Sequence, residues 1–292
     1  MAEVPTVLVV GLTLGFSFAL LSLAFAVVYA VIGEINLAFG DSIVLASFIA
    51  YAVYSSSGNY ALTALAGIAA GMVLLMLTEL LALRPLRGRG DALVPIMATL
   101  GLALVMRNAA QNRFGAEDKF FPPLFGSAHH PVAGTSVDVT LAWTAVFVVL
   151  LAAGLVVFLQ RTDWGRAVRA VRQDTLAARL GGIPVGRVTT LLYAGCGAVG
   201  ALAALLFFGE AGSVSIPTGF QFTLNAYTAA VLGGGRSLLG AAAGGLLLGL
   251  ADAVAQVTVG AIWQQPINVA ILVLVLVARP GGLARRVVAE RV

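Results

Sequence analysis

The sequence is 292 residues long, with 60% hydrophobic residues, 10% charged residues and a formal net charge of +4 at pH 7. A water-soluble domain carries roughly 25% charged residues, so this composition, with a mean hydropathy of +1.00, excludes a soluble globular protein. The apolar runs reach helix-spanning length and lack the alternating pattern of a transmembrane barrel. We therefore expect an all-α, polytopic integral membrane helical bundle that forms a single transmembrane domain over residues 1–292.

Nine apolar segments follow one another along the chain, and each is a candidate membrane helix. They lie near residues 6–31, 36–55, 61–82, 93–113, 139–159, 190–209, 222–234, 238–258 and 262–278. The segment 222–234 is short for a full crossing, which takes about 20 residues. It fits a half-helix or a re-entrant segment as well as a crossing, so the sequence predicts eight or nine transmembrane helices.

Basic residues gather in three places outside these segments. They are Arg84, Arg87 and Arg89 in one short loop, Arg161 to Arg187 in a longer loop, and Arg279, Arg285, Arg286 and Arg291 at the end. Because arginine and lysine are enriched in cytoplasmic loops, all three places are predicted to be cytoplasmic and the N-terminus external. The proline-containing stretch 114–138 is then an external loop. The basic residues form no groove with interleaved aromatic side chains, so we expect a multi-pass plasma-membrane protein that binds no nucleic acid.

The first motif that could carry chemistry interrupts the apolar sequence at 33–41, GEINLAFGD. It places Glu34, Asn36 and Asp41 among glycines. Acids at membrane depth need partners and mark solute pathways, and glycines allow a helix to break where its backbone lines a wet cavity. The alternative is a tight cytoplasmic hairpin in which both acids lie in headgroup water and Asp41 caps the next helix. The residues alone leave both interpretations open.

A glycine-rich region at 233–249 follows in the second half of the chain. Two pairs of glycines there have the small-xxx-small spacing that lets helix backbones touch, which favours close packing within the bundle. These pairs are Gly240 with Gly244 and Gly245 with Gly249. The preceding Gly-Gly-Gly-Arg-Ser lacks the ending of a phosphate-binding loop, which argues against nucleotide binding. Taken together, the interruptions at 33–41 and 233–245 are also compatible with two transporter halves around a midplane site.

Polar side chains at Asn225, Tyr227 and Thr228 precede the glycine-rich region. They suit hydrogen bonds between helices, and alternatively contact with a passing solute. Isolated charged residues near predicted span ends are expected to reach the membrane interface. These are Glu79, Arg107, Glu210 and Asp252. No metal site, cofactor or hydrolase motif is expected.

The loop at about 160–189 places arginines at helical spacing between Ala and Val, at Arg166, Arg169 and Arg172. A short helix follows through Ala177 and Ala178 and is predicted to end at Gly-Gly and Pro. A helix with a small-residue face and a basic face can dock into a groove of a soluble partner. The alternative is an anchor for membrane lipid with anionic headgroups. The small, flat face formed by the two alanines favours docking.

Together these motifs resemble the permease subunits of branched-chain amino acid type ABC importers, over nearly the whole chain. The matching stretches are 11–15, 32–41, 165–167, 177–181, 230–240 and 279–283. The resemblance implies a coupling helix with a Glu-Ala-Ala-x-x-x-Gly pattern, which Ala177, Ala178 and Gly182 fit, whereas Leu176 replaces the glutamate. It also implies a second permease subunit in a homo- or heterodimer, two cytoplasmic ATPase subunits and an external substrate-binding protein.

We therefore expect one half of a translocation pathway for branched-chain amino acids or a related small solute such as urea or an amide. Partner ATPases would drive it, and the chain would have no ATPase site of its own. The predicted pathway residues are Asn36, Asp41, Asn225 and Thr228. The predicted ATPase-coupling residues are Arg166, Arg169, Ala177, Ala178, Gly181 and Gly182. The alternative is a standalone secondary transporter or channel that uses Glu34 and Asp41 as proton or ion sites.

Overall fold

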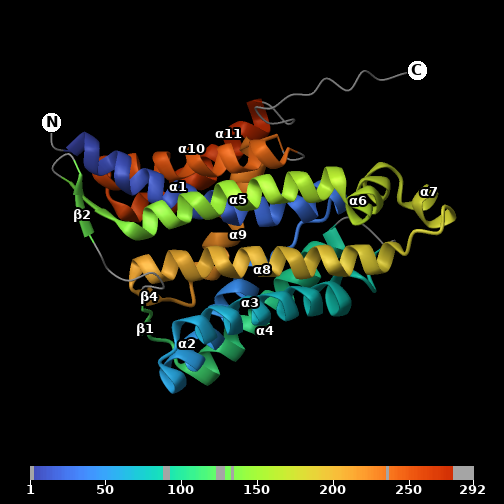
Figure 1. Ribbon diagram of the computed structural model, residues 1–292, viewed down its shortest axis with the longest axis horizontal. Helices are drawn as coiled ribbons and strands as arrows, with labels where there is room; N and C mark the ends of the chain where they lie inside the picture. The colour runs from blue at the N-terminus through green and yellow to red at the C-terminus, as the bar shows by residue number, and fades with distance from the viewer. Residues whose placement is uncertain (1–2, 88–92, 123–128, 133–134, 235–236, 279–292) are drawn as a thin grey trace.

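A computed structural model of the chain describes residues 3–87, 93–122, 129–132, 135–234 and 237–278 (Figure 1). Arg89, Arg236 and the predicted cytoplasmic arginines after position 278 lie outside the described residues. Within these ranges the protein is a bundle of helices, which confirms the all-α prediction. The helices are α1 (Glu3–Ile32), α2 (Phe39–Ser57), α3 (Tyr60–Thr78) with the π-helical η1 (Glu79–Leu83), α4 (Leu93–Phe114), α5 (Val139–Arg161), α6 (Asp163–Gln173), α7 (Thr175–Leu180), α8 (Val185–Ala211), α9 (Thr218–Leu232), α10 (Leu238–Thr258), the short 3₁₀ turn η2 (Ala261–Trp263) and α11 (Gln264–Ala278).

Among the described residues, six helices are long and apolar enough to cross a membrane: α1, α2, α3 with η1, α4, α8 and α10. A seventh crossing arises if α5 and α6 are counted as one span, although these two helices meet at 81°. Helices α9 and α11 have 15 residues each, about 22 Å of helix, against a hydrocarbon thickness of about 30 Å. The predicted count of eight or nine is therefore not confirmed, because α11 as well as α9 is short for a full crossing and α5 bends sharply into α6.

Short strands gather at one end of the bundle, on the left in Figure 1, and α6 and α7 lie at the opposite end. Strand β1 (Lys119–Phe120) pairs antiparallel with β4 (Ser213–Val214), and β2 (His129–Val132) pairs with β3 (Thr135–Asp138). The predicted external loop 114–138 and the predicted cytoplasmic loop 160–189 thus lie at opposite ends. This arrangement agrees with the orientation deduced from the arginines.

Helices α1 and α10 lie side by side with their backbones in contact (Figure 1). A Cβ added at Gly245 would lie 2.4 Å from the backbone nitrogen of Ala19, and one at Gly249 would lie 2.1 Å from that of Gly15. Glycine is therefore required at both positions for the observed approach of the two helices. The small-xxx-small spacing places both glycines on the face that contacts α1.

The other predicted glycine pair packs α10 against α9. A Cβ at Gly240 would lie 2.0 Å from the Gly233 carbonyl oxygen, and one at Gly244 would lie 2.1 Å from that of Ala229. The prediction that all four glycines serve close packing is confirmed. These contacts hold α10 closely against α9.

Helix α2 begins in the middle of the bundle rather than at its end. The ring of Phe39, its first residue, packs edge-on against Phe25 of α1, with centroids 5.6 Å apart. Phe25 lies seven residues before the end of α1 at Ile32, which is about 10 Å along the helix. A Cβ at Gly200, near the midpoint of α8, would lie 3.2 Å from the same Phe39 ring. Residues 33–38 therefore run back along α1 into the bundle before α2 starts.

The substitution Gly249→Ala tests the contact between α1 and α10. Its Cβ would overlap the Gly15 backbone, and we expect overpacking to lower the free energy of unfolding by about 1–3 kcal/mol. Thermal unfolding of the purified protein in detergent measures the change. Gly101→Ala in α4 is the matched control, because a Cβ there meets no atom within 4 Å. Equal melting temperatures for the two variants would contradict the proposed packing.

Candidate functional site

The break between α1 and α2 is held by side chains that replace helical hydrogen bonds. Asn36 is 4% exposed, and its Oδ1 accepts a hydrogen bond from the backbone nitrogen of Ala38 at 2.9 Å. The backbone nitrogen of Leu37 donates to Thr99 Oγ1 of α4 at 3.2 Å. Irregular backbone at membrane depth persists only where the protein supplies such partners. The predicted pathway residue Asn36 is thus also a structural support of the break.

The first turns of α9 close the other side of this break. Thr223 Oγ1 accepts a hydrogen bond from the backbone nitrogen of Gly40 at 2.8 Å and lies 3.4 Å from the Leu37 carbonyl oxygen. A Cβ at Gly40 would lie 1.8 Å from the carbonyl oxygen of Gly219. The N-terminal turns of α2 and α9 therefore touch through two glycines, inside the bundle.

Asp41 lies at this contact and forms an ion pair with Arg107 of α4. Arg107 Nε and Nη2 donate to Asp41 Oδ1 at 3.1 and 3.0 Å, and Nη2 lies 3.2 Å from Oδ2. Asp41 is in the first turn of α2, and a Cβ at Gly219 in the first turn of α9 would lie 2.8 Å from its Oδ1. Two helix N-termini, each with a partial positive charge, therefore stabilise this carboxylate.

The two members of this ion pair differ in their exposure to solvent. Asp41 is 4% exposed, whereas the side chain of Arg107 is 29% exposed. The guanidinium thus stays partly accessible while its position is fixed by a buried carboxylate. A fixed, accessible cation at this depth can bind a carboxylate group of a solute, since arginine presents paired donors to such groups.

The structure rules out one alternative for Asp41 and overturns the expectation for Arg107. The N-cap position of α2 is Ala38, which makes no side-chain cap, so Asp41 does not cap the helix but binds Arg107. Arg107 does not reach the membrane interface from a helix end, because it lies seven residues before Phe114, about 10 Å inside α4. An arginine in the interior of an apolar helix was the sequence signal for this pair.

The other two predicted pathway residues, Asn225 and Thr228, lie in α9, where both are buried. Asn225 belongs to a second polar cluster, in which Asn268 Nδ2 donates to Asn225 Oδ1 at 3.1 Å and to Asp252 Oδ2 at 3.2 Å. Asp252 Oδ1 and Asn268 Oδ1 are buried without hydrogen-bond partners. The four predicted residues therefore do not form one site, because Asn36 and Asp41 lie at the break, Asn225 contacts α11, and Thr228 is buried in α9. Asp252, which we expected at the membrane interface, is 3% exposed.

The proposed pairing of the interruptions 33–41 and 233–245 also changes. The first interruption meets the start of α9 at Gly219 and Thr223, and the second serves packing among α1, α9 and α10. The segment that meets the first interruption is thus the connection between β4 and the start of α9. The sequence has no run of glycines at that connection. Its only helix-breaking residues there are Pro217 and Gly219.

A third group of charges lies where α1, η1 and α8 approach one another. Arg87 donates to Glu34 at 2.8 and 2.9 Å and to Glu79 at 3.2 Å, and Thr190 Oγ1 donates to Glu79 at 2.8 Å. Burial alone would lower the pKa of the Arg87 guanidinium, but its hydrogen bonds and the charges of Glu34 and Glu79 raise it above its usual value. Glu79 is fully buried, so the expectation that it reaches the interface was wrong. The network ties three helices together at the end of the bundle near α6.

The basic loop has the predicted order of two short helices and a glycine break. Asp174 Oδ1 accepts hydrogen bonds from the backbone nitrogens of Leu176 and Ala177 at 2.8 and 2.9 Å, which caps α7. The helix ends at Leu180 with Gly181 as its C-cap, and Gly182 follows with φ of +79°, a conformation that glycine adopts without strain.

The apolar surface of α7 differs from the flat alanine face expected. Ala178 is buried in a cluster with Val168 and Val171 of α6, Val27 of α1 and Val185 and Val188 of α8. Ala177 stays exposed, and the large exposed side chains are Leu176 at 67% and Leu180 at 83%. Arg166 and Arg169 are exposed on α6, and Arg166 pairs with Asp163.

Membrane-length helices, two helix N-termini that meet inside the bundle around an ion pair, and a basic amphipathic loop at one end define a multi-pass membrane permease. The family model described as "Branched-chain amino acid transport system / permease component" matches residues 7–278. The chain therefore belongs to this family of permeases.

Relatives of known name match the chain over nearly its whole length. It is 33% identical to the high-affinity branched-chain amino acid transport system permease protein BraD of Pseudomonas aeruginosa, over 98% of this chain and 97% of BraD. It is 30% identical to the corresponding protein LivH of Salmonella typhimurium, over 97% of this chain and 96% of LivH. The fructose import permease protein FrcC of Rhizobium meliloti is 39% identical, but over 39% of this chain and 33% of FrcC.

A double-mutant cycle tests the pair of Asp41 and Arg107. Arg107→Gln leaves a buried carboxylate without its partner, and breaking such a pair costs about 3–5 kcal/mol. We expect the lower part of this range, because Arg107 is partly exposed, and we expect Asp41→Asn in the same protein to restore more than half of the loss. Thermal unfolding of the four proteins in detergent gives the coupling energy.

The exposed pair Asp163 and Arg166 in α6 is the control for this cycle. Its coupling should be about 0.5 kcal/mol or less, as for other exposed pairs within a helix. If the effects of Asp41→Asn and Arg107→Gln on the free energy of unfolding were additive, the two residues would not form the stabilising ion pair described here.

Proposed function

We propose that this chain is the permease subunit of an ATP-driven importer of branched-chain amino acids. The main support is the match along nearly the whole chain to permeases named for this transport, whereas the match to a fructose permease covers a minor part. The proposed assembly contains a second permease subunit, two cytoplasmic ATPase subunits and an external substrate-binding protein. The chain itself acts as a transport component of the cytoplasmic membrane and leaves ATP hydrolysis to its partners.

The proposed pathway passes the contact between α2 and α9. An amino acid carries a carboxylate, and the partly exposed guanidinium of Arg107, which Asp41 holds within 3.2 Å, offers it the complementary charge. Arg107 is the accessible member, so it meets the solute first, while Asp41 and Asn36 hold the site open from behind. Asn225 and Thr228 would contribute only after α9 moves, since both are buried in the single chain.

In this proposal the ATPase subunits act on the permease through α6 and α7. Leu176 and Leu180, one helical turn apart, are the exposed apolar anchors that a groove on an ATPase subunit would receive. Ala178 on the same helix packs into the valine cluster shared with α1 and α8. A displacement of α7 would therefore be transmitted to two membrane helices, because packed cores move as units rather than deform continuously. In this proposal Arg166 and Arg169 orient the loop towards acidic groups of the partner, and Gly181 and Gly182 provide its hinge.

A standalone transporter that uses Glu34 and Asp41 as ion sites is the second candidate. Both carboxylates are already paired with arginines, Glu34 with Arg87 and Asp41 with Arg107. An ion or proton would have to displace a bound guanidinium at each position, which is unfavourable at low dielectric. This observation favours the importer.

Replacement of Leu176 and Leu180 by Ser tests the drive. We expect the double variant to insert into the membrane normally but to lose more than tenfold of its affinity for the ATPase subunits, as when apolar anchors of an interface are truncated. Substrate-stimulated ATP hydrolysis by the assembled complex is the measurement. Leu239→Ser, which alters a leucine that is 63% exposed in α10, should leave that activity unchanged. Full stimulation in the double variant would refute the role of α7.

Reconstituted uptake tests the class of transporter. Proteoliposomes with the assembled complex and ATP should accumulate labelled leucine, isoleucine or valine in the presence of the external binding protein. Proteoliposomes with this chain alone should accumulate none under a proton or sodium gradient. Gradient-driven accumulation by the chain alone would favour the standalone transporter.

A further inference from the structure

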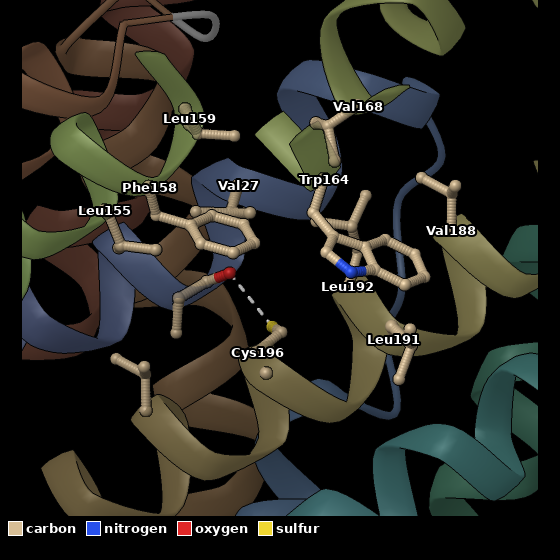
Figure 2. A pocket seen from close by; sticks show the side chains of 13 residues that line it. Val27, Leu155, Phe158, Leu159, Trp164, Val168, Val188, Leu191, Leu192 and Cys196 are labelled. Carbon is tan, nitrogen blue, oxygen red and sulfur yellow. Dashed lines mark hydrogen bonds between the residues drawn. The ribbon is translucent and has the colours of Figure 1, made fainter. Parts of the chain in front are cut away.

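An apolar groove runs along α8 between α5 and α6, with α1 as its floor (Figure 2). Its volume is about 430 Å³. Figure 2 shows Phe158 and Trp164 on the two sides of the groove and Cys196 at its base. The Cys196 thiol donates to the Ala24 carbonyl oxygen at 2.9 Å, so it has no proton left for a ligand. The groove therefore suits a hydrocarbon ligand rather than a polar one.

The length and direction of the groove match one leaflet of a membrane. The α8 residues that line it share one helix face and run from Val188, next to the basic loop, to Val199. This distance of eleven positions is about 16 Å, which is half of the hydrocarbon thickness of about 30 Å. Trp164 at the loop end is 46% exposed, as is usual for tryptophan at the headgroup level.

Positive charge is present at this end of the groove. Arg169 follows the lining residue Val168, Arg187 precedes the lining residue Val188, and Arg161 ends α5 two positions after Leu159. All three arginines are exposed, and none forms an ion pair within the part of the chain that the structure describes. Exposed arginines beside a hydrocarbon slot complement a lipid with a negative headgroup.

We propose that this groove binds one acyl chain of an anionic phospholipid from the cytoplasmic leaflet, with the phosphate against Arg161 and Arg187. A groove of one leaflet's depth, apolar walls and a cationic rim each fit that molecule. The bound chain packs against Val168 and Val188, which also belong to the valine cluster behind α7. The lipid thus braces the same elements that carry the basic loop.

Fluorescence quenching tests this site in the full chain. Replacing Trp143 and Trp263 by Phe leaves Trp164 as the single tryptophan of three, and the protein is placed in nanodiscs that contain brominated phosphatidylglycerol or brominated phosphatidylcholine at equal mole fraction. We expect several-fold stronger quenching by phosphatidylglycerol. Arg161→Gln and Arg187→Gln should lower this preference by roughly fivefold each, the effect of one basic residue near an anionic surface.

Gly195→Phe fills the groove without disturbing the bundle, because Gly195 lines it and a Cβ there meets no atom within 4 Å. The preference for phosphatidylglycerol should disappear in this variant and persist in the control Gly101→Phe, where a Cβ also meets no atom within 4 Å. Equal quenching by both lipids, or a preference that survives Gly195→Phe, would overturn the proposal in favour of non-specific surface lipid. Trp164 emission insensitive to both lipids would overturn it in favour of a protein that covers the groove.

Discussion

In a membrane, each backbone group that leaves a helix needs a protein partner, because the hydrocarbon offers none. This constraint explains the centre of the bundle. The chain leaves helical structure at 33–38 and begins α9 beside the same point, and Thr223 joins the two segments by binding Gly40. Close approach through Gly40 and Gly219 then brings two helix N-termini to Asp41. The buried carboxylate is stable there, and it in turn fixes Arg107.

The remaining architecture keeps these segments in place. Glycines of α10 pack closely against α1 and α9 and so keep α9 beside the break. At one end, Arg87 ties Glu34, which follows α1, to Glu79 and through it to α8. At that end the valine cluster also joins α6 and α7 to α1 and α8. A force on α7 thus reaches the helix that precedes the break, which is the mechanical requirement of an importer driven from outside the chain.

Sequence patterns predicted the features of the structure that depend on residues close together in the chain. Composition gave the all-α membrane class, arginine spacing gave the amphipathic α6, and glycine spacing gave the packing face of α10. The contacts between different helices could not be predicted from such patterns. Arg107, Glu79 and Asp252 each appeared as an isolated charge, and their partners Asp41, Arg87 and Asn268 lie 66, 8 and 16 positions away. Segment length marked 222–234 as short for a full crossing, but it did not show that α9 begins inside the bundle beside the break.

The accessibility of Leu37 tests most directly whether the break lines an aqueous route within the membrane. Leu37 is partly exposed, and its backbone bond to Thr99 does not depend on its side chain. With Cys196→Ser removing the single native cysteine, Leu37→Cys in the assembled complex should react with a charged, water-soluble thiol reagent at a rate that changes with ATP. Reaction as slow as that of Gly101→Cys on the exposed face of α4, with and without ATP, would contradict the account.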